Sequence, residues 1–318
     1  MSTSGSYDFT LSRNNIVKRA YNFIGIYNAA DTIESQDQDI ALDLLNMMIK
    51  SWQAETRSQW NRQTATLFTA YQSNQYNLSL TGDHCTKSYK STTITPAEAS
   101  GQTVISLAST TGMTAGDYIG IQLDGGTRQW TTIVTVDSSV QVTITAALTG
   151  AAASGNTVVT YTTKINRPLE IFTANWKRLS ADTETPMEQV LYEEYQYIPD
   201  KVTDGAPNCY MYDAQLTTGK LYLWPRPNDV DYIINFSYQE STEDFDAQAN
   251  NADFPQEWEL ALVVNLSALL AFPNGRFPEM DKIQMQADKL KMLALNYDNN
   301  NTSIILTPKN RASSRVIV

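Results

Sequence analysis

The sequence predicts an α+β fold: a helical bundle built from both chain ends, with a β-hairpin region and an inserted small β-barrel or sandwich domain. Two observations support this prediction. Apolar residues recur with the 3.6-residue period of a helix near both ends of the chain, whereas the period falls to two in the middle. The composition changes at the same places, since only nine charged residues lie within residues 76–165.

These changes divide the chain into five expected parts. They are a first helical part at 1–72, an inserted β domain at 73–165, a β-hairpin and acidic connecting region at 166–252, a second helical part at 253–301 and a C-terminal tail at 302–318. The two helical parts are expected to pack together around one core. The β domain would then change what the helical body contacts without changing how it packs.

The first helical part holds two expected helices. One starts after Ser12 and ends near Gly25. Its apolar face carries Ile16, Ala20, Phe23 and Ile24. The other starts at hydroxyl caps in residues 32–35 and has acids in its first turn, where they interact favourably with the helix dipole. Its apolar stripe contains Ile40, Ala41, Leu44, Leu45, Met48, Ile49 and Trp52. A stripe of this width needs partners on more than one side.

The inserted domain is expected to contain five or six short strands joined by tight turns. Branched apolar residues alternate with threonine or glutamine at 129–136 and 140–144, around the turn Asp137-Ser138-Ser139. Asp124-Gly125-Gly126 is a second hairpin turn, since glycine permits the positive φ that such turns require. Further strands are expected at 103–107, 118–122 and 157–161.

Beyond the insertion, two strands at 219–225 and 231–238 are expected to pair as a hairpin around a proline-containing turn. Acidic residues gather on both sides of them. Seven acids and no bases lie within residues 240–259. This local excess predicts an acidic face.

The chain closes with two helices and a basic tail. Asp253-Phe254-Pro255 starts the first helix, whose apolar residues on nearly all faces predict burial. The second starts near Pro278, after the break at Pro273-Asn274-Gly275. From residue 302 the tail has bases, no acids and a β-branched end, so we expect it to dock on a partner; a disordered end is the alternative. Its candidate partner-binding residues are Lys309, Arg311, Arg315, Val316, Ile317 and Val318.

Composition and charge exclude several classes of protein. Hydrophobic residues make up 42% of the chain, which indicates a folded protein. The net charge of −11 argues against nonspecific binding to a phosphate backbone. No secretory signal pattern and no run of eighteen apolar residues occurs, so we expect no membrane partner. Cys85 and Cys209 are expected to be free thiols of a reducing compartment.

Few residues suggest chemistry, so we expect no enzyme, no cofactor and no metal. His84 is the only histidine, and its neighbour Cys85 would point to the opposite face of an extended segment, so a surface or turn histidine is expected. One histidine and two unpaired cysteines match no common zinc site. Glu193 and Glu194 would suit a glycosidase pair, but no apolar pocket is indicated around them, which favours a solvated acidic face.

Seven tyrosines follow in the same region, and we expect them in the core or in subunit contacts. A sugar or nucleobase site is the alternative. They are Tyr192, Tyr195, Tyr197, Tyr210, Tyr212, Tyr222 and Tyr232.

Four segments, covering about half the chain together with their surroundings, resemble a known family. They are Ile16-Val17-Lys18-Arg19-Ala20, residues 37–52, Leu221-Tyr222-Leu223-Trp224-Pro225 and Phe254-Pro255-Gln256-Glu257-Trp258. The chain resembles the head-to-tail adaptor proteins of short-tailed phages, of the packaged-DNA stabilisation or tail tubular A type. It departs from the shorter members by carrying residues 76–165.

This resemblance implies a structural virion protein, made in the host cytoplasm and located at the head-to-tail interface. It implies a ring of twelve copies, clamped between the portal protein and the downstream nozzle protein of the tail. DNA would pass through the lumen without specific binding, and an acidic wall suits that role because it repels phosphate.

Two other functions remain as alternatives. One is a different tail or virion ring protein with a carbohydrate-binding β module, for which a trimeric fibre repeat would be expected. The other is a peptidoglycan hydrolase, which needs a carboxylate in an apolar cleft. The sequence shows neither feature.

Overall fold

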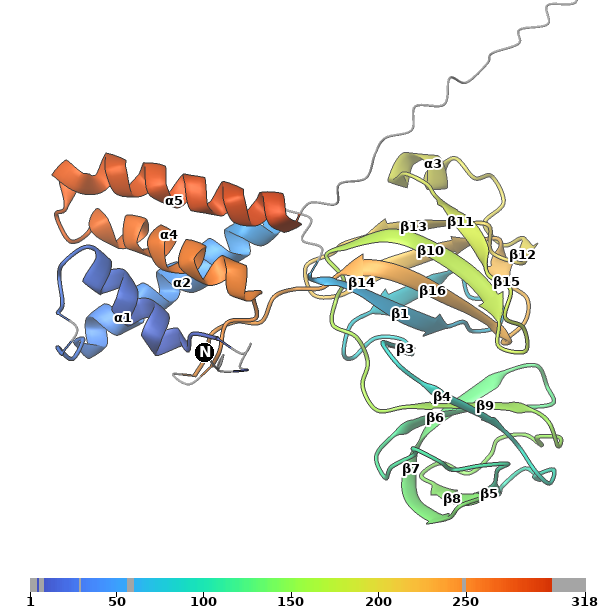
Figure 1. Cartoon of the computed structure of the whole chain (residues 1–318). Helices are drawn as coiled ribbons and strands as arrows, with labels where there is room; N and C mark the ends of the chain where they lie inside the picture. Colours follow the sequence, from blue (N-terminus) through green and yellow to red (C-terminus); the bar gives the residue numbers. More distant parts are fainter. Residues whose placement is uncertain (1–4, 6–8, 29, 56–59, 248–249, 299–318) are drawn as a thin grey trace, which may run out of the picture. The chain divides into compact units, whose positions relative to one another are not determined.

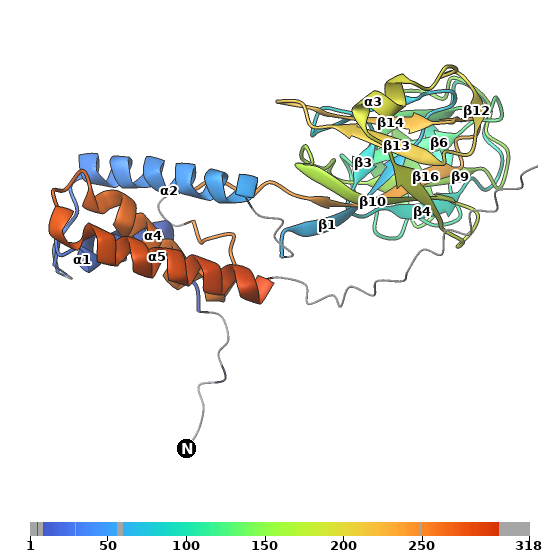
Figure 2. The ribbon, with the colours of Figure 1, turned by 90° about the horizontal axis from the view of Figure 1, so that it is seen from above.

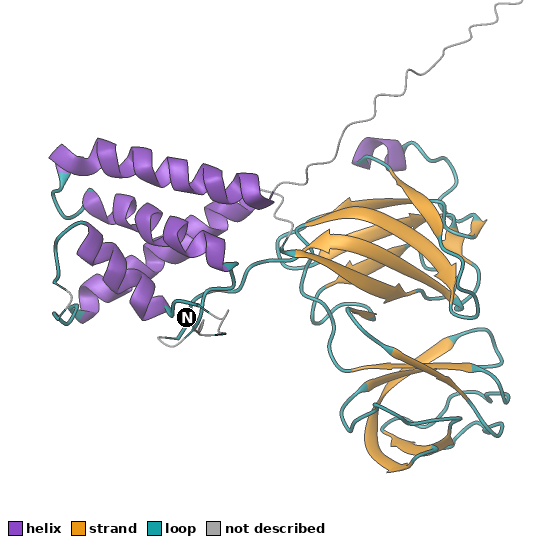
Figure 3. Cartoon of the chain, viewed as in Figure 1, coloured by secondary structure: helices purple, strands orange, loops and turns teal. Residues whose placement is uncertain are grey.

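The computed structural model describes residues 5, 9–28, 30–55, 60–247 and 250–298 (Figure 1). Residue contacts divide the chain into two compact units. One is formed by residues 1–60 together with 244–318, and the other by residues 61–243. The described part of the first unit is mainly helical, whereas the second is formed by two barrel-like sheets (Figure 3).

The expected fold class is wrong for the chain as a whole. Strands hold 31% of the described residues and helices 26%, so the described structure is mostly β and is not a helical bundle built from both chain ends. The reason is that long amphipathic helices give a strong periodic signal. Strands as short as β3 (Cys85–Thr86), β12 (Asp204–Gly205) and β15 (Arg226–Pro227) give almost none.

Four long helices form the helical unit. They are α1 (Arg13–Phe23), α2 (Ser35–Glu55), α4 (Glu259–Ala271) and α5 (Phe277–Asp298), with the 3-10 turn η1 (Gln256–Trp258) before α4. In Figure 2, α4 lies between α2 and α5, and it contacts each of the other three helices. Its almost uniformly apolar sequence is explained by this central position.

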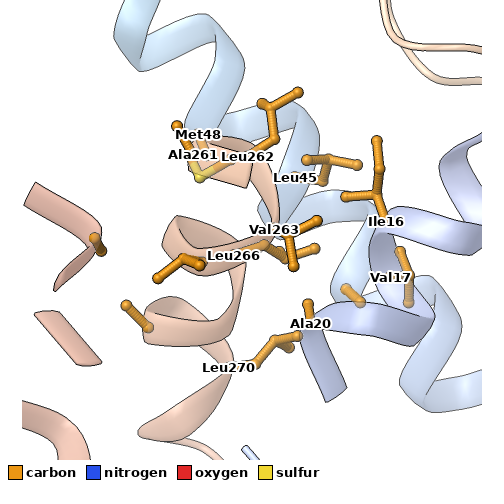
Figure 4. Packing of buried hydrophobic residues seen from close by; sticks show 14 of the residues in the cluster. Ile16, Val17, Ala20, Leu45, Met48, Ala261, Leu262, Val263, Leu266 and Leu270 are labelled. Carbon is orange, nitrogen blue, oxygen red and sulfur yellow. The ribbon is translucent and has the colours of Figure 1, made fainter. Parts of the chain in front are cut away.

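The core of the helical unit contains residues from α1, α2 and α4 that face one another (Figure 4). Leu45 and Leu266 are both fully buried there. The indole rings of Trp52 and Trp258 also meet, with centroids 5.7 Å apart. Polar groups tie early and late residues together as well, since Ser267 Oγ donates to the carbonyl oxygen of Ala20 at 3.1 Å.

The larger sheet of the second unit has eight strands in the order β2-β14-β13-β11-β10-β16-β1-β3. Apart from β3, they are β1 (Arg62–Phe68), β2 (Gln75–Leu78), β10 (Glu170–Arg178), β11 (Thr185–Gln189), β13 (Cys209–Asp213), β14 (Gly219–Trp224) and β16 (Tyr232–Gln239). Only the β11–β13 pair is parallel among the described ladders of this sheet. The short helix α3 (Tyr192–Gln196) follows β11.

The expected hairpin between residues 219–225 and 231–238 is not formed. β14 pairs with β13 and β2, whereas β16 pairs with β1 and β10. The ladder between β1 and β16 runs without a shift from Arg62↔Gln239 to Phe68↔Ile233, so a long non-local ladder replaces the local one. The proline-containing connection after β14 forms the short strand β15, which pairs with β12.

The smaller sheet has six strands in the order β4-β9-β6-β7-β8-β5. They are β4 (Lys90–Thr93), β5 (Val104–Ser106), β6 (Tyr118–Gln122), β7 (Arg128–Ser138), β8 (Gln141–Ile144) and β9 (Thr157–Tyr161). A bridge between Ile94 and Leu107 joins the two end strands, so the sheet closes into a barrel. Two register shifts between β7 and β8 bend the long strand around it.

The bounds expected at 118–122 and 157–161 are those of β6 and β9. The inserted barrel begins later than the expected residue 73, because β2 and β3 belong to the larger sheet. A hydrophobic cluster rich in aromatic rings joins the two sheets, with Phe68 and Ile233 on one side and Tyr161 and Trp130 on the other. The barrel therefore shares a packed contact with the larger sheet.

Candidate partner-binding site

An apolar groove of about 370 Å³ lies between α2, α4 and α5. Its lining residues are Leu44, Met47, Met48, Ser51, Trp52, Asn265, Leu269, Gln284, Asp288 and Lys291. The five residues from α2 recur at intervals of three and four, which places them on one face of that helix. The apolar stripe of α2 therefore continues from the buried core to the solvent-exposed surface.

Large apolar side chains are exposed in and near this groove. Met47 is 60% exposed and Leu269 is 41% exposed. On α5, Met285 and Met292 are exposed as well. Methionine side chains are flexible and adapt to irregular partner surfaces. Exposed apolar surface of this kind is typical of a site that another protein covers.

Polar groups at the groove are fixed in position. The Asn265 amide donates to the carbonyl oxygens of Ala261 at 2.8 Å and Ala287 at 3.1 Å, so it links α4 to α5. Gln284 Nε2 donates to Asp288 Oδ1 at 2.8 Å. Lys291 Nζ lies 5.2 Å from the centroid of the Trp52 ring, within the range of a cation–π interaction. The groove therefore offers a partner both signs of charge.

His84 was expected to be a surface or turn residue. It does lie in a bend, before β3, but its ring is half-buried. The ring stacks on Trp130 with centroids 3.7 Å apart and planes at 6°. Its Nδ1 is 2.5 Å from the Tyr161 hydroxyl oxygen. Burial, together with the charges of Lys164 and Arg128, lowers the pKa of His84 to about 3, so the ring is neutral at neutral pH.

The neighbouring thiol is unsuited to nucleophilic catalysis. Cys85 is buried in the core of the larger sheet, and this burial raises its pKa well above the usual value. Both cysteines are free. Among the residues that the structure describes, no group of three or more His, Cys, Asp or Glu side chains could hold a metal ion.

The acidic pair Glu193 and Glu194 lies exposed on α3. Glu194 Oε2 accepts a hydrogen bond from the Leu191 amide at 2.8 Å, so this carboxylate caps the short helix. The tyrosines divide between core and surface. Tyr195 and Tyr210 are buried, whereas Tyr197 is 83% exposed.

The six residues expected to bind a partner, Lys309, Arg311, Arg315, Val316, Ile317 and Val318, lie outside the described residues. The groove was not predicted from the sequence, although the wide apolar stripe of α2 could have indicated it. A stripe of that width needs packing partners on more than one side, and in the structure the side of α2 that carries Met47 stays exposed. In the parts of the helices that the structure describes, none is long and apolar enough to cross a membrane.

No model of a known protein family matches the chain, and no curated protein matches its sequence.

Proposed function

We propose that this protein is a structural component of a virion that forms a ring at the head-to-tail interface. The ring would join the portal protein to the nozzle protein of the tail and surround the channel for DNA. The role is structural, without catalysis or a cofactor. The observation that supports it best is the apolar groove between α2, α4 and α5, because a monomer would leave this surface in water.

A ring needs a contact that repeats from each subunit to the next. Such a contact joins two different surfaces, and it closes when the rotation between subunits divides a full turn. The groove supplies one of these surfaces. Covering a side chain such as Met47, which is 60% exposed, contributes about 1–2 kcal/mol per contact. The family resemblance supports a ring of twelve.

The charge of the chain supports passage of DNA without specific binding. Each subunit carries a net charge of −11. Phosphate repulsion by a ring of such subunits prevents DNA from adhering to the wall of a channel. The negative charge of the ring would then favour transport of the genome through the channel over its recognition.

The groove can be tested by placing charge on it. We expect the wild-type protein to assemble into rings on the cognate portal, as seen by sedimentation and negative-stain electron microscopy. The double variant Met47→Glu/Leu269→Glu should stay monomeric with an unchanged melting curve, because both side chains are solvent-exposed.

A matched control is Leu216→Glu, which alters a leucine that is 91% exposed in the second unit, residues 61–243, called the β unit below. This variant should assemble like the wild type. If the wild-type protein stays monomeric with and without portal, or if the double variant forms the same rings, the proposal is wrong.

A further inference from the structure

A polar depression of about 430 Å³ lies on the face of the larger sheet that is turned away from its core. Its floor is formed by β10, β16 and β1, which are neighbours in the sheet. The strand register places six polar side chains in two rows across these strands. One row is Thr173, Ser237 and Thr64, and the other is Asn175, Asn235 and Thr66. Neighbouring strands lie about 4.8 Å apart, so each row is a ladder of hydrogen-bonding groups.

The second row is held in place by hydrogen bonds. Thr66 Oγ1 donates to Asn235 Oδ1 at 2.8 Å. The Asn235 amide donates to Glu184 Oε1 at 2.7 Å, and the Asn175 amide donates to Glu184 Oε2 at 3.3 Å. The carboxylate is therefore fixed beside both amides before any ligand arrives, which lowers the entropy cost of binding.

Other residues at the depression balance its charge and add an aromatic ring. Lys87 pairs with Glu240, with Nζ and Oε2 2.6 Å apart. Lys177 also lines the depression, and its positive charge offsets the negative charge of Glu184. The Tyr89 ring also lines the depression. Burial and the nearby Glu184 raise the pKa of Tyr89, so its hydroxyl stays protonated and can donate.

These groups select a class of ligand. An apolar ligand gains little from a floor of hydroxyls and amides, since it would desolvate them without replacing their hydrogen bonds. A strongly charged ligand is repelled by the side chain of like charge, Glu184 for an anion and Lys177 for a cation. Adjacent hydroxyls of a sugar can both donate to and accept from amides and a carboxylate, while the C–H face of its ring can pack on an aromatic side chain.

We propose that this depression binds a neutral oligosaccharide. Its volume falls within the range of small-molecule sites, roughly 300–1,000 Å³. A single site of exposed polar groups binds weakly, because each hydrogen bond replaces one to water. Presentation of many copies on one ring would raise the overall affinity, and this last point alone rests on the proposed function.

The test uses the full-length protein and a panel of maltohexaose, cellohexaose, mannohexaose and chitohexaose. Saturation-transfer NMR would detect binding, and calorimetric titration would give the affinity. We expect at least one of these probes to bind, and Asn175→Ala/Asn235→Ala to weaken it about tenfold or more. Asn77→Ala is the matched control, because Asn77 is exposed on β2 of the same sheet outside the depression. It should bind like the wild type.

The proposal is overturned if none of the four probes binds at 10 mM, a concentration that would nearly saturate even a weak site with a dissociation constant of about 1 mM. It is also overturned if the double variant, with an unchanged melting curve, binds as well as the wild type. A heparin hexasaccharide serves as an anionic comparison. Binding of this probe alone would assign the depression to charge attraction by its lysines and would equally refute the neutral-ligand proposal.

Discussion

His84 provides a direct test of how the barrel contacts the larger sheet. In the folded protein its pKa is lowered to about 3 by burial and by the charges of Lys164 and Arg128, against an ordinary value of 6.5. As pH falls below 6.5, the unfolded chain binds a proton that the folded chain excludes. The stability contributed by the neutral, stacked ring is therefore present above pH 6.5 and is lost progressively toward pH 3.

The size of this loss follows from the two pKa values. Full exclusion of the proton gives a slope approaching about 1.4 kcal/mol per pH unit, or about 2 kcal/mol between pH 7 and pH 5. Because the half-buried ring keeps some contact with solvent, we expect about 1 kcal/mol over this interval.

Two measurements check this prediction. His84 is the only histidine, so the titration of its ring proton is unambiguous by NMR and should show no midpoint between pH 7.5 and 5. Urea unfolding at pH 7 and pH 5 should show a larger loss of stability for the wild type than for His84→Phe, which keeps an aromatic ring but does not titrate. A ring proton that titrates near pH 6.5, or equal losses in both proteins, would refute the reasoning.

Two further changes test the packing of each unit. A methyl group at Gly120 would come within 2.7 Å of the Trp130 ring, so Gly120→Ala should lower the unfolding free energy by about 1–3 kcal/mol in urea, while Gly125→Ala, where the added atom meets nothing within 4 Å, should be nearly neutral. Leu266→Ala should cost the helical unit about 3 kcal/mol, because this side chain is fully buried among α1, α2 and α4, and a loss below about 1 kcal/mol would contradict that core.

The helices could be predicted because their signals are local. The apolar stripe through Leu45 and the uniformly apolar segment around Leu266 each determine a helix without reference to the rest of the chain. The strands β6 and β9 were predictable for the same reason, since branched residues there are bounded by glycine and turn residues. The share of strand in the chain could not be predicted, because its shortest strands form only by pairing with neighbouring strands.

The candidate sites depend on contacts between residues far apart in sequence. Asn175 and Asn235 become neighbours only through the register of β10 and β16. The stacking of His84 on Trp130 likewise depends on how the barrel meets the larger sheet. Adjacent Met47 and Met48 differ in burial because α4 and α5 cover only one side of α2. No local pattern distinguishes these outcomes.

The division of one hydrophobic core between early and late segments affects how the protein is made. α2 leaves the ribosome long before α4, which lies about two hundred residues later in the chain. At a translation rate of about 5–20 residues per second, this gap lasts roughly 10–40 s. During that time Leu45 and Ile49 have no partner from α4. The whole β unit is synthesised in this interval, before α4. The β unit can therefore fold first, and the nascent helices are the segment that a chaperone would need to shield.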